Sequence, residues 1–128
     1  MSAGSVSKID LVLALKGKTQ TSLELKRHLA PKTIGSIVRA LPLEGNAHMM
    51  GASIAFMDTT LVAGGEKLRT QFKKGDVSFM ASNGAICFFL EDTSQTKPMT
   101  LVGKITANLE ALSGIKPGDI FSLSQAGT

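Results

Sequence analysis

The chain lacks several features that identify common classes of protein. Its 128 residues include no tryptophan and no tyrosine. The core must therefore rest on aliphatic side chains, with six phenylalanines and six methionines filling irregular gaps. No stretch reaches the roughly 18 to 20 consecutive apolar residues of a membrane span. Residues 1–7 carry no charge ahead of a long apolar run, so we expect a flexible leader there rather than a secretory signal.

Cysteine and metal-ligand patterns are also scarce. Cys87 is the only cysteine, so no internal disulfide can form, which fits a reducing compartment and a cytoplasmic protein. His28 and His48 have no second His or Cys at ligand spacing, and we expect no metal. No phosphate-binding loop and no pair of carboxylates for acid–base chemistry stands out. The sequence therefore predicts no cofactor and no catalytic residue.

The net charge of +4 is unevenly distributed. Residues 1–40 carry seven Lys or Arg against two acidic residues, a balance of +5. The basic residues stand singly or in pairs, and no aromatic residue lies among them to stack on bases. We therefore expect a solvated basic side and no nucleic-acid partner.

The hydrophobic pattern predicts a β-rich domain. Apolar residues alternate over 8–16, a turn follows, and a second alternating segment at 22–26 completes a hairpin. An apolar stripe after Pro31 predicts a helix that ends at Pro42, and 108–113 predict a second short helix. Residues 58–74 and 92–98 are expected to be mostly loop. Further strands are expected at 51–57, 61–62, 77–80, 85–90, 99–105 and 120–123.

About eight short strands with two short helices suggest a barrel or a sandwich. We favour a closed barrel over residues 8–125, a single domain, because pairing of the first and last strands would remove exposed edges. The run at 85–90 is apolar on both faces and is expected to be a central strand.

Several strings in this order resemble the cyclophilins. LELKRHLAPKTIGSIVRAL is similar to their strand, A-P-x-T element and first helix, and GDVSFMASNGAICFFL to their G-x-L-S-M-A and G-S-Q-F-F-I segments. A closer resemblance, over about residues 8–123, is to a small microbial family of cyclophilin-like proteins with no established function. It rests on L-P-x-x-G at 41–45, G-D-V at 75–77, A-I-C-F-F at 85–89, V-G-K-I at 102–105 and L-E-A-L at 109–112.

The resemblance implies a cyclophilin-like barrel but not the usual activity. Prolyl isomerases of this fold use an arginine in an F-H-R string and a glutamine in a Q-F-F string. Here Met49 follows Ala47 and His48, and Cys87 precedes the two phenylalanines. The tryptophan of the isomerase pocket has no counterpart. This chain's version of the site is therefore more apolar.

The resulting hypothesis is a non-catalytic binding module for a peptide segment or a small apolar ligand. Cys87 could be a packed core residue or could line the groove. His48 could be a surface histidine or a contact at the mouth of the groove. The methionines could fill the core or line the groove. Two alternatives stay open: a weak peptidyl-prolyl isomerase, and an interaction protein that forms homo-oligomers. The candidate groove comprises His48, Met49, Phe79, Met80, Asn83, Cys87 and Phe89.

Overall fold

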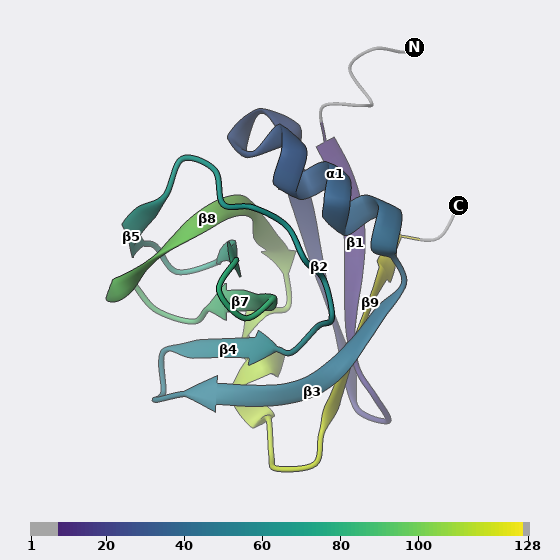
Figure 1. The fold of residues 1–128 in the computed structure, drawn as a ribbon. Helices are drawn as coiled ribbons and strands as arrows, with labels where there is room; N and C mark the ends of the chain where they lie inside the picture. The colour runs from purple at the N-terminus through teal and green to yellow at the C-terminus, as the bar shows by residue number, and fades with distance from the viewer. Residues whose placement is uncertain (1–7, 127–128) are drawn as a thin grey trace.

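Eight antiparallel strands close into a barrel, as the sequence predicted (Figure 1). The computed structural model describes residues 8–126, so the leader predicted at 1–7 lies outside the described residues. Around the barrel the strands follow the order β2-β1-β9-β3-β4-β7-β6-β8, and β8 pairs with β2 to close it. Their bounds are β1 Lys8–Leu15, β2 Thr19–Lys26, β3 Leu43–Met50, β4 Ile54–Met57, β6 Asp76–Met80, β7 Ala85–Phe89, β8 Thr93–Ala107 and β9 Ile120–Gln125.

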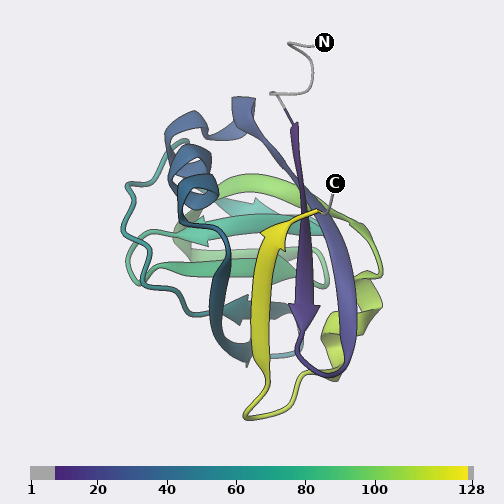
Figure 2. The ribbon, with the colours of Figure 1, turned by 90° about the vertical axis from the view of Figure 1, so that its right-hand side faces the viewer.

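Two contacts close the barrel. The first and last strands pair as expected, from Leu11 opposite Gln125 to Leu15 opposite Phe121 (Figure 2). On the other side of the hairpin, Leu25 of β2 lies opposite Gly103 of β8. A Cβ atom at Gly103 would overlap the backbone carbonyl of the neighbouring β2 residue, so only glycine lets these strands approach so closely.

Two helices contribute apolar side chains to the core inside the barrel. Helix α1 (Pro31–Ala40) lies across one end, where Ile34 and Ile37 are fully buried in the inner core (Figure 1). The 3-10 helix η3 (Leu109–Gly114) contributes the buried Leu112 to the same core. A three-residue turn, η2 (Arg27–Leu29), precedes α1. The two helices are therefore where the apolar patterns predicted them.

A second, smaller core lies on the outside of the barrel wall. Strand β7 alternates between the two cores: Ile86 and Phe88 face the barrel interior, whereas Cys87 and Phe89 face outward. This confirms the central, doubly buried strand predicted from its sequence. Strand β5 (Arg69–Phe72) pairs with β8 and is not part of the barrel (Figure 1). The outer core comprises Ile54, Phe72, Met80, Ala85, Cys87, Phe89 and Met99.

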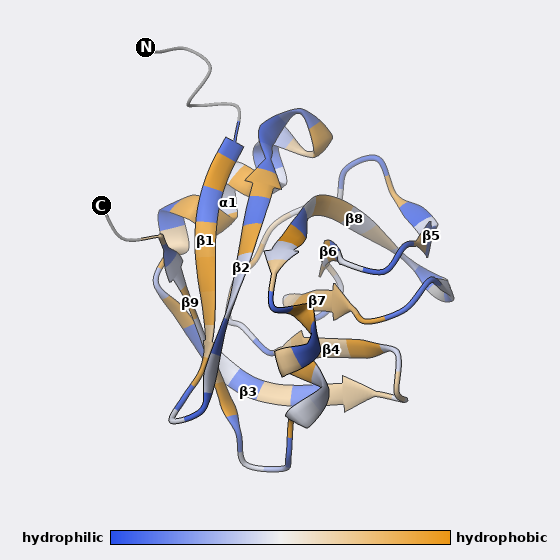
Figure 3. Cartoon of the chain, turned by 180° about the vertical axis from the view of Figure 1, so that it is seen from behind, coloured by the Kyte–Doolittle hydropathy of each residue, from blue (hydrophilic) through white to orange (hydrophobic). Residues whose placement is uncertain are grey.

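The hydropathy of the first hairpin explains why it was predictable. Strand β1 is largely hydrophobic, whereas β2 is polar at 19–22 and then alternates between hydrophobic and hydrophilic residues (Figure 3). Neither β3 nor β5 has such a pattern, and both were missed. Residues 43–50 form a strand because they pair with β9 and β4. The strand expected at 51–57 is shorter than predicted and covers only residues 54–57.

Two further expectations were wrong. Residues 61–62 form no strand, and the strand of that region is β5, at 69–72. Residues 93–98, expected as loop, are the first part of the 15-residue β8, because they pair with β5. Pairing partners distant in sequence decided both cases. No helix within residues 8–126 is long and apolar enough to cross a membrane.

Candidate functional site

One row of side chains crosses the outer face of the barrel wall. By strand register, His48 of β3 lies opposite Phe56 of β4, Phe56 opposite Cys87 of β7, and Cys87 opposite Ser78 of β6. The row begins at His48, which is partly exposed, and ends at Ser78, which is fully buried and contacts Met99 of β8. The row contains two of the residues predicted to line a groove, His48 and Cys87.

The part of this outer face around Cys87 and Phe89 is closed to solvent. Phe72 of β5 is 3 % exposed and stacks on Phe89, with ring centroids 4.5 Å apart and an interplanar angle of 13°. The Ser78 hydroxyl donates to the sulfur of Met99 at 3.2 Å. Cys87 is 0 % exposed, and burial raises the pKa of its thiol to about 12. The thiol is therefore protonated and shielded at neutral pH.

The structure separates the residues predicted to line the groove. Met80, Cys87 and Phe89 come together in the outer core. Phe79 is fully buried on the inner side of the wall, and Met49 packs against the same inner core. The thickness of the sheet thus lies between these two groups.

Two other predicted residues stay near the surface. Asn83 is exposed in the turn before β7, where its side-chain oxygen accepts a hydrogen bond from the backbone N–H of Ala85 at 3.2 Å. His48 is the outward-facing neighbour of Met49. The position that the resemblance assigns to the isomerase arginine therefore points into the barrel in this chain, and the outward side chain is a histidine.

His48 forms an ordered polar pair. Its Nε2 donates to a carboxylate oxygen of Asp58 at 2.6 Å, since a carboxylate can only accept. The imidazole also stacks on Phe56, with centroids 5.0 Å apart. The two polar side chains are 42 % and 53 % exposed, so the pair is largely in solvent. It fixes the imidazole at the margin of the apolar face.

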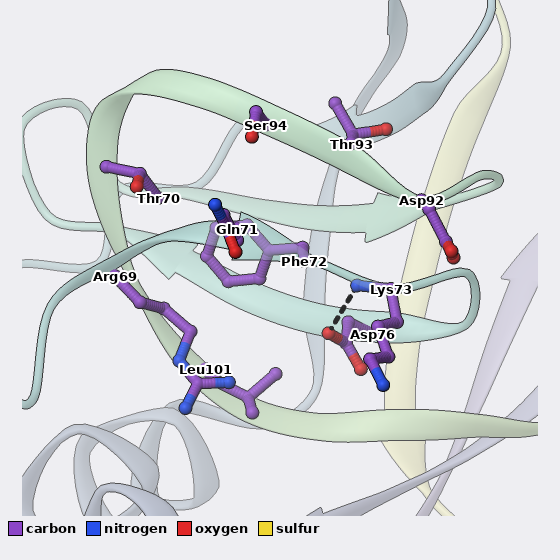
Figure 4. A pocket seen from close by; sticks show the side chains of 10 residues that line it. All are labelled: Arg69, Thr70, Gln71, Phe72, Lys73, Asp76, Asp92, Thr93, Ser94 and Leu101. Atoms are coloured by element: carbon purple, nitrogen blue, oxygen red, sulfur yellow. Dashed lines mark hydrogen bonds between the residues drawn. The ribbon is translucent and has the colours of Figure 1, made fainter.

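A hollow of about 870 Å³ lies beside the sealed outer core (Figure 4). Phe72 and Leu101 provide apolar lining and belong to or pack on that core. The predicted groove residues Cys87 and Phe89 thus lie in the layer that supports this hollow. The remaining lining residues are polar or charged: Arg69, Thr70, Gln71, Lys73, Asp76, Asp92, Thr93 and Ser94.

The two carboxylates of the hollow shape its wall. Asp76 accepts a hydrogen bond from the backbone N–H of Lys73 at 2.8 Å, and Asp92 accepts one from Lys74 at 2.9 Å. These bonds hold the turn between β5 and β6. Each carboxylate thus caps a turn, a common role of aspartate side chains.

Sequence reasoning missed this hollow. Residues 69–73 lie in the polar stretch expected to be loop, and the sequence RTQFK does not alternate clearly between polar and apolar residues. The one signal was Phe72, an isolated aromatic residue in a polar segment. Within residues 8–126, no group of three or more His, Cys, Asp or Glu could hold a metal ion.

Known proteins share this fold. The structure is similar to the solution structure of the hypothetical protein AF2241 from Archaeoglobus fulgidus, with a TM-score of 0.80 and 23 % identity, covering 94 % of this chain and 96 % of that one. It is also similar to the structure of McbB in complex with tryptophan, with a TM-score of 0.77 and 12 % identity, covering 92 % of this chain and 45 % of that one. No curated protein matches the chain.

The family match agrees with the barrel topology. The sequence matches the family described as Cyclophilin-like over residues 8–123, which is nearly the whole of the described chain. The chain therefore belongs to the cyclophilin-like family.

Proposed function

We propose that this protein is a binding module whose ligand occupies the hollow formed by β5, the start of β6 and β8. The observation that carries the proposal is the hollow itself. Its volume of about 870 Å³ falls within the range of ligand sites, roughly 300–1,000 Å³. Such sites combine apolar lining with a few polar groups that orient the ligand.

The hollow provides both parts. Leu101 offers apolar contact, and the almost fully buried Phe72 lines the hollow while it stacks on Phe89. Arg69 and Lys73 can donate to an anionic or carbonyl group. The structure of McbB in complex with tryptophan supports the idea in general terms, because a barrel of this fold there accompanies a small aromatic ligand.

Binding is favoured over prolyl isomerisation. Cys87 and Phe89 stand where the isomerase string has its glutamine and last phenylalanine, and both are fully covered. Met49 packs against the inner core rather than facing a substrate. A peptide on the outer face would therefore meet Phe72 and the hollow before it met these residues.

A ligand screen with a blocked hollow tests the proposal. A library of small molecules and short peptides would be screened by thermal shift, and each hit would be repeated on Ser94→Trp. Ser94 is exposed and lines the hollow, so an indole there should fill it and abolish the shift. Ser113→Trp, at an exposed position in η3, is the matched control and should keep the shift. The proposal fails if no compound stabilises the protein, or if the hits stabilise Ser94→Trp as well as the wild type.

A further inference from the structure

The hollow runs along an unpaired strand edge. Strand β5 is last in the sheet order, and β8 is its only strand partner among the described residues. One edge of β5 therefore presents backbone N–H and C=O groups with no strand to bond them. Outside the ladder with β8, residues 69–72 make no further backbone hydrogen bond within 8–126.

The lining residues indicate that this edge borders the hollow. Five consecutive residues, 69–73, line it. The hollow also touches Thr93 and Ser94, which pair with Phe72 and Gln71 across the other edge of β5, as well as Asp76 and Leu101, which do not pair with β5. It therefore follows the whole length of β5 and extends beyond the ladder that β5 forms with β8. The site can therefore offer main-chain hydrogen bonds as well as side-chain contacts.

Charge gives the hollow a direction. Arg69 lies on one side, beside Leu101, whereas Lys73, Asp76 and Asp92 lie toward the other, so that side carries one more negative than positive charge (Figure 4). The two carboxylates already accept backbone hydrogen bonds. The side chain of Arg69 makes no ion pair or hydrogen bond with any other residue of the described chain. An exposed guanidinium with no internal partner suits a carboxylate supplied by a ligand.

We infer that the occupant is an extended peptide segment of a partner protein that adds a strand to the free edge of β5. This inference rests on the proposed function and names its ligand. Main-chain hydrogen bonds to residues 69–72 supply affinity in this mode, and side chains supply specificity. The segment carries an acidic residue at the end that reaches Arg69 and an apolar residue over Phe72 and Leu101.

Selection from a displayed random library of peptides of about seven residues, with the full chain as bait, tests this inference. An enriched peptide would be synthesised in three forms: unmodified, and N-methylated at either set of alternate residues. Only one set of amides faces β5, so one N-methylated form should bind at least about 10-fold more weakly and the other should bind normally. Fluorescence anisotropy measures all three.

Charge variants test the direction of binding. Arg69→Gln should weaken the peptide about 5-fold at low salt, and the difference should shrink as salt is added. Lys97→Gln removes an exposed cation that does not line the hollow and should change the affinity less than about 2-fold.

The outcomes separate this inference from the proposed function. Equal binding of both N-methylated forms would overturn strand addition. Equal effects of the two charge variants would overturn the contact between an acidic residue of the peptide and Arg69. The selection could enrich no peptide while small molecules still stabilise the wild type but not Ser94→Trp. In that case the binding role stands and the peptide is excluded. If nothing binds, both proposals fail.

Discussion

Phe72 is the side chain on which the sealed face depends, and its removal gives the sharpest prediction. Phe72→Ala would delete a 3 % exposed ring that stacks on Phe89 at 4.5 Å. Buried Phe→Ala substitutions cost about 3–5 kcal/mol of unfolding free energy. Because Phe72 lies on an outer strand with exposed neighbours, β5 can partly collapse onto the gap. We therefore expect the lower end of this range, about 3 kcal/mol.

Two assays would measure this effect. Urea unfolding followed by far-ultraviolet circular dichroism gives the free energy, since the chain has no tryptophan to report by fluorescence. Reaction of Cys87 with a thiol reagent gives the opening of the outer core, because this thiol is fully buried. A loss of about 3 kcal/mol corresponds to roughly a 100-fold faster reaction if global opening limits it.

The neighbouring Gln71→Ala provides the control. Gln71 is exposed on the same strand, so its removal should change the free energy by no more than about 0.5 kcal/mol. If Phe72→Ala destabilises the protein by less than about 1 kcal/mol, or leaves the thiol as slow as in the wild type, the outer core is not sealed by this ring and the reasoning is refuted.

Three further predictions concern closure, pH and catalysis. Gly103→Ala should lower the unfolding free energy by more than about 3 kcal/mol, because a Cβ atom there overlaps the backbone of β2. Gly114→Ala, where a Cβ atom meets open space, should cost little stability. Equal urea midpoints of the two variants would contradict this prediction. The pKa of Asp119 is lowered mainly by the backbone N–H of Lys116, so its stabilisation is full above the ordinary aspartate pKa and is lost as pH falls through the lowered one. Asp119→Asn should therefore flatten the fall of Tm between about pH 6 and about pH 2, and an unchanged slope would be against it. A protease-coupled assay should find no prolyl isomerisation above the uncatalysed rate, because Cys87 at the glutamine position is covered, and a clear acceleration would disprove the sealed face.

The sequence predicted those parts of the fold in which one segment carries its own pattern. The first hairpin has period-2 alternation, helix α1 has an apolar stripe between Pro31 and Pro42, and β7 is apolar throughout. Strand β3, with the sequence LEGNAHMM, carries no comparable pattern and exists because β9 and β4 pair with it. Such pairing partners lie far away in the chain, so local patterns cannot indicate them.

The candidate site was harder to predict for a related reason. Strand β6 is buried on both faces, and nothing in the string VSFM says that Phe79 points inward while Met80 points outward. A one-residue error in this alternation moves a side chain through the wall. The burial of the outer face also depends on Phe72, which lies in a segment that the sequence predicted to be a loop. The groove residues expected from the resemblance lie on both faces of the wall, and the sequence did not indicate the strand that covers the outer face.

Mapping of a bound ligand tests the central claim most directly. An NMR titration of the labelled full chain with a hit from the ligand screen would report each backbone amide. The account predicts that the shifted amides cluster at residues 69–73, at Ser94 and at Leu101, around the hollow. Shifts centred instead on His48 and Phe56, at the open margin of the same face, would place the site elsewhere and contradict the account.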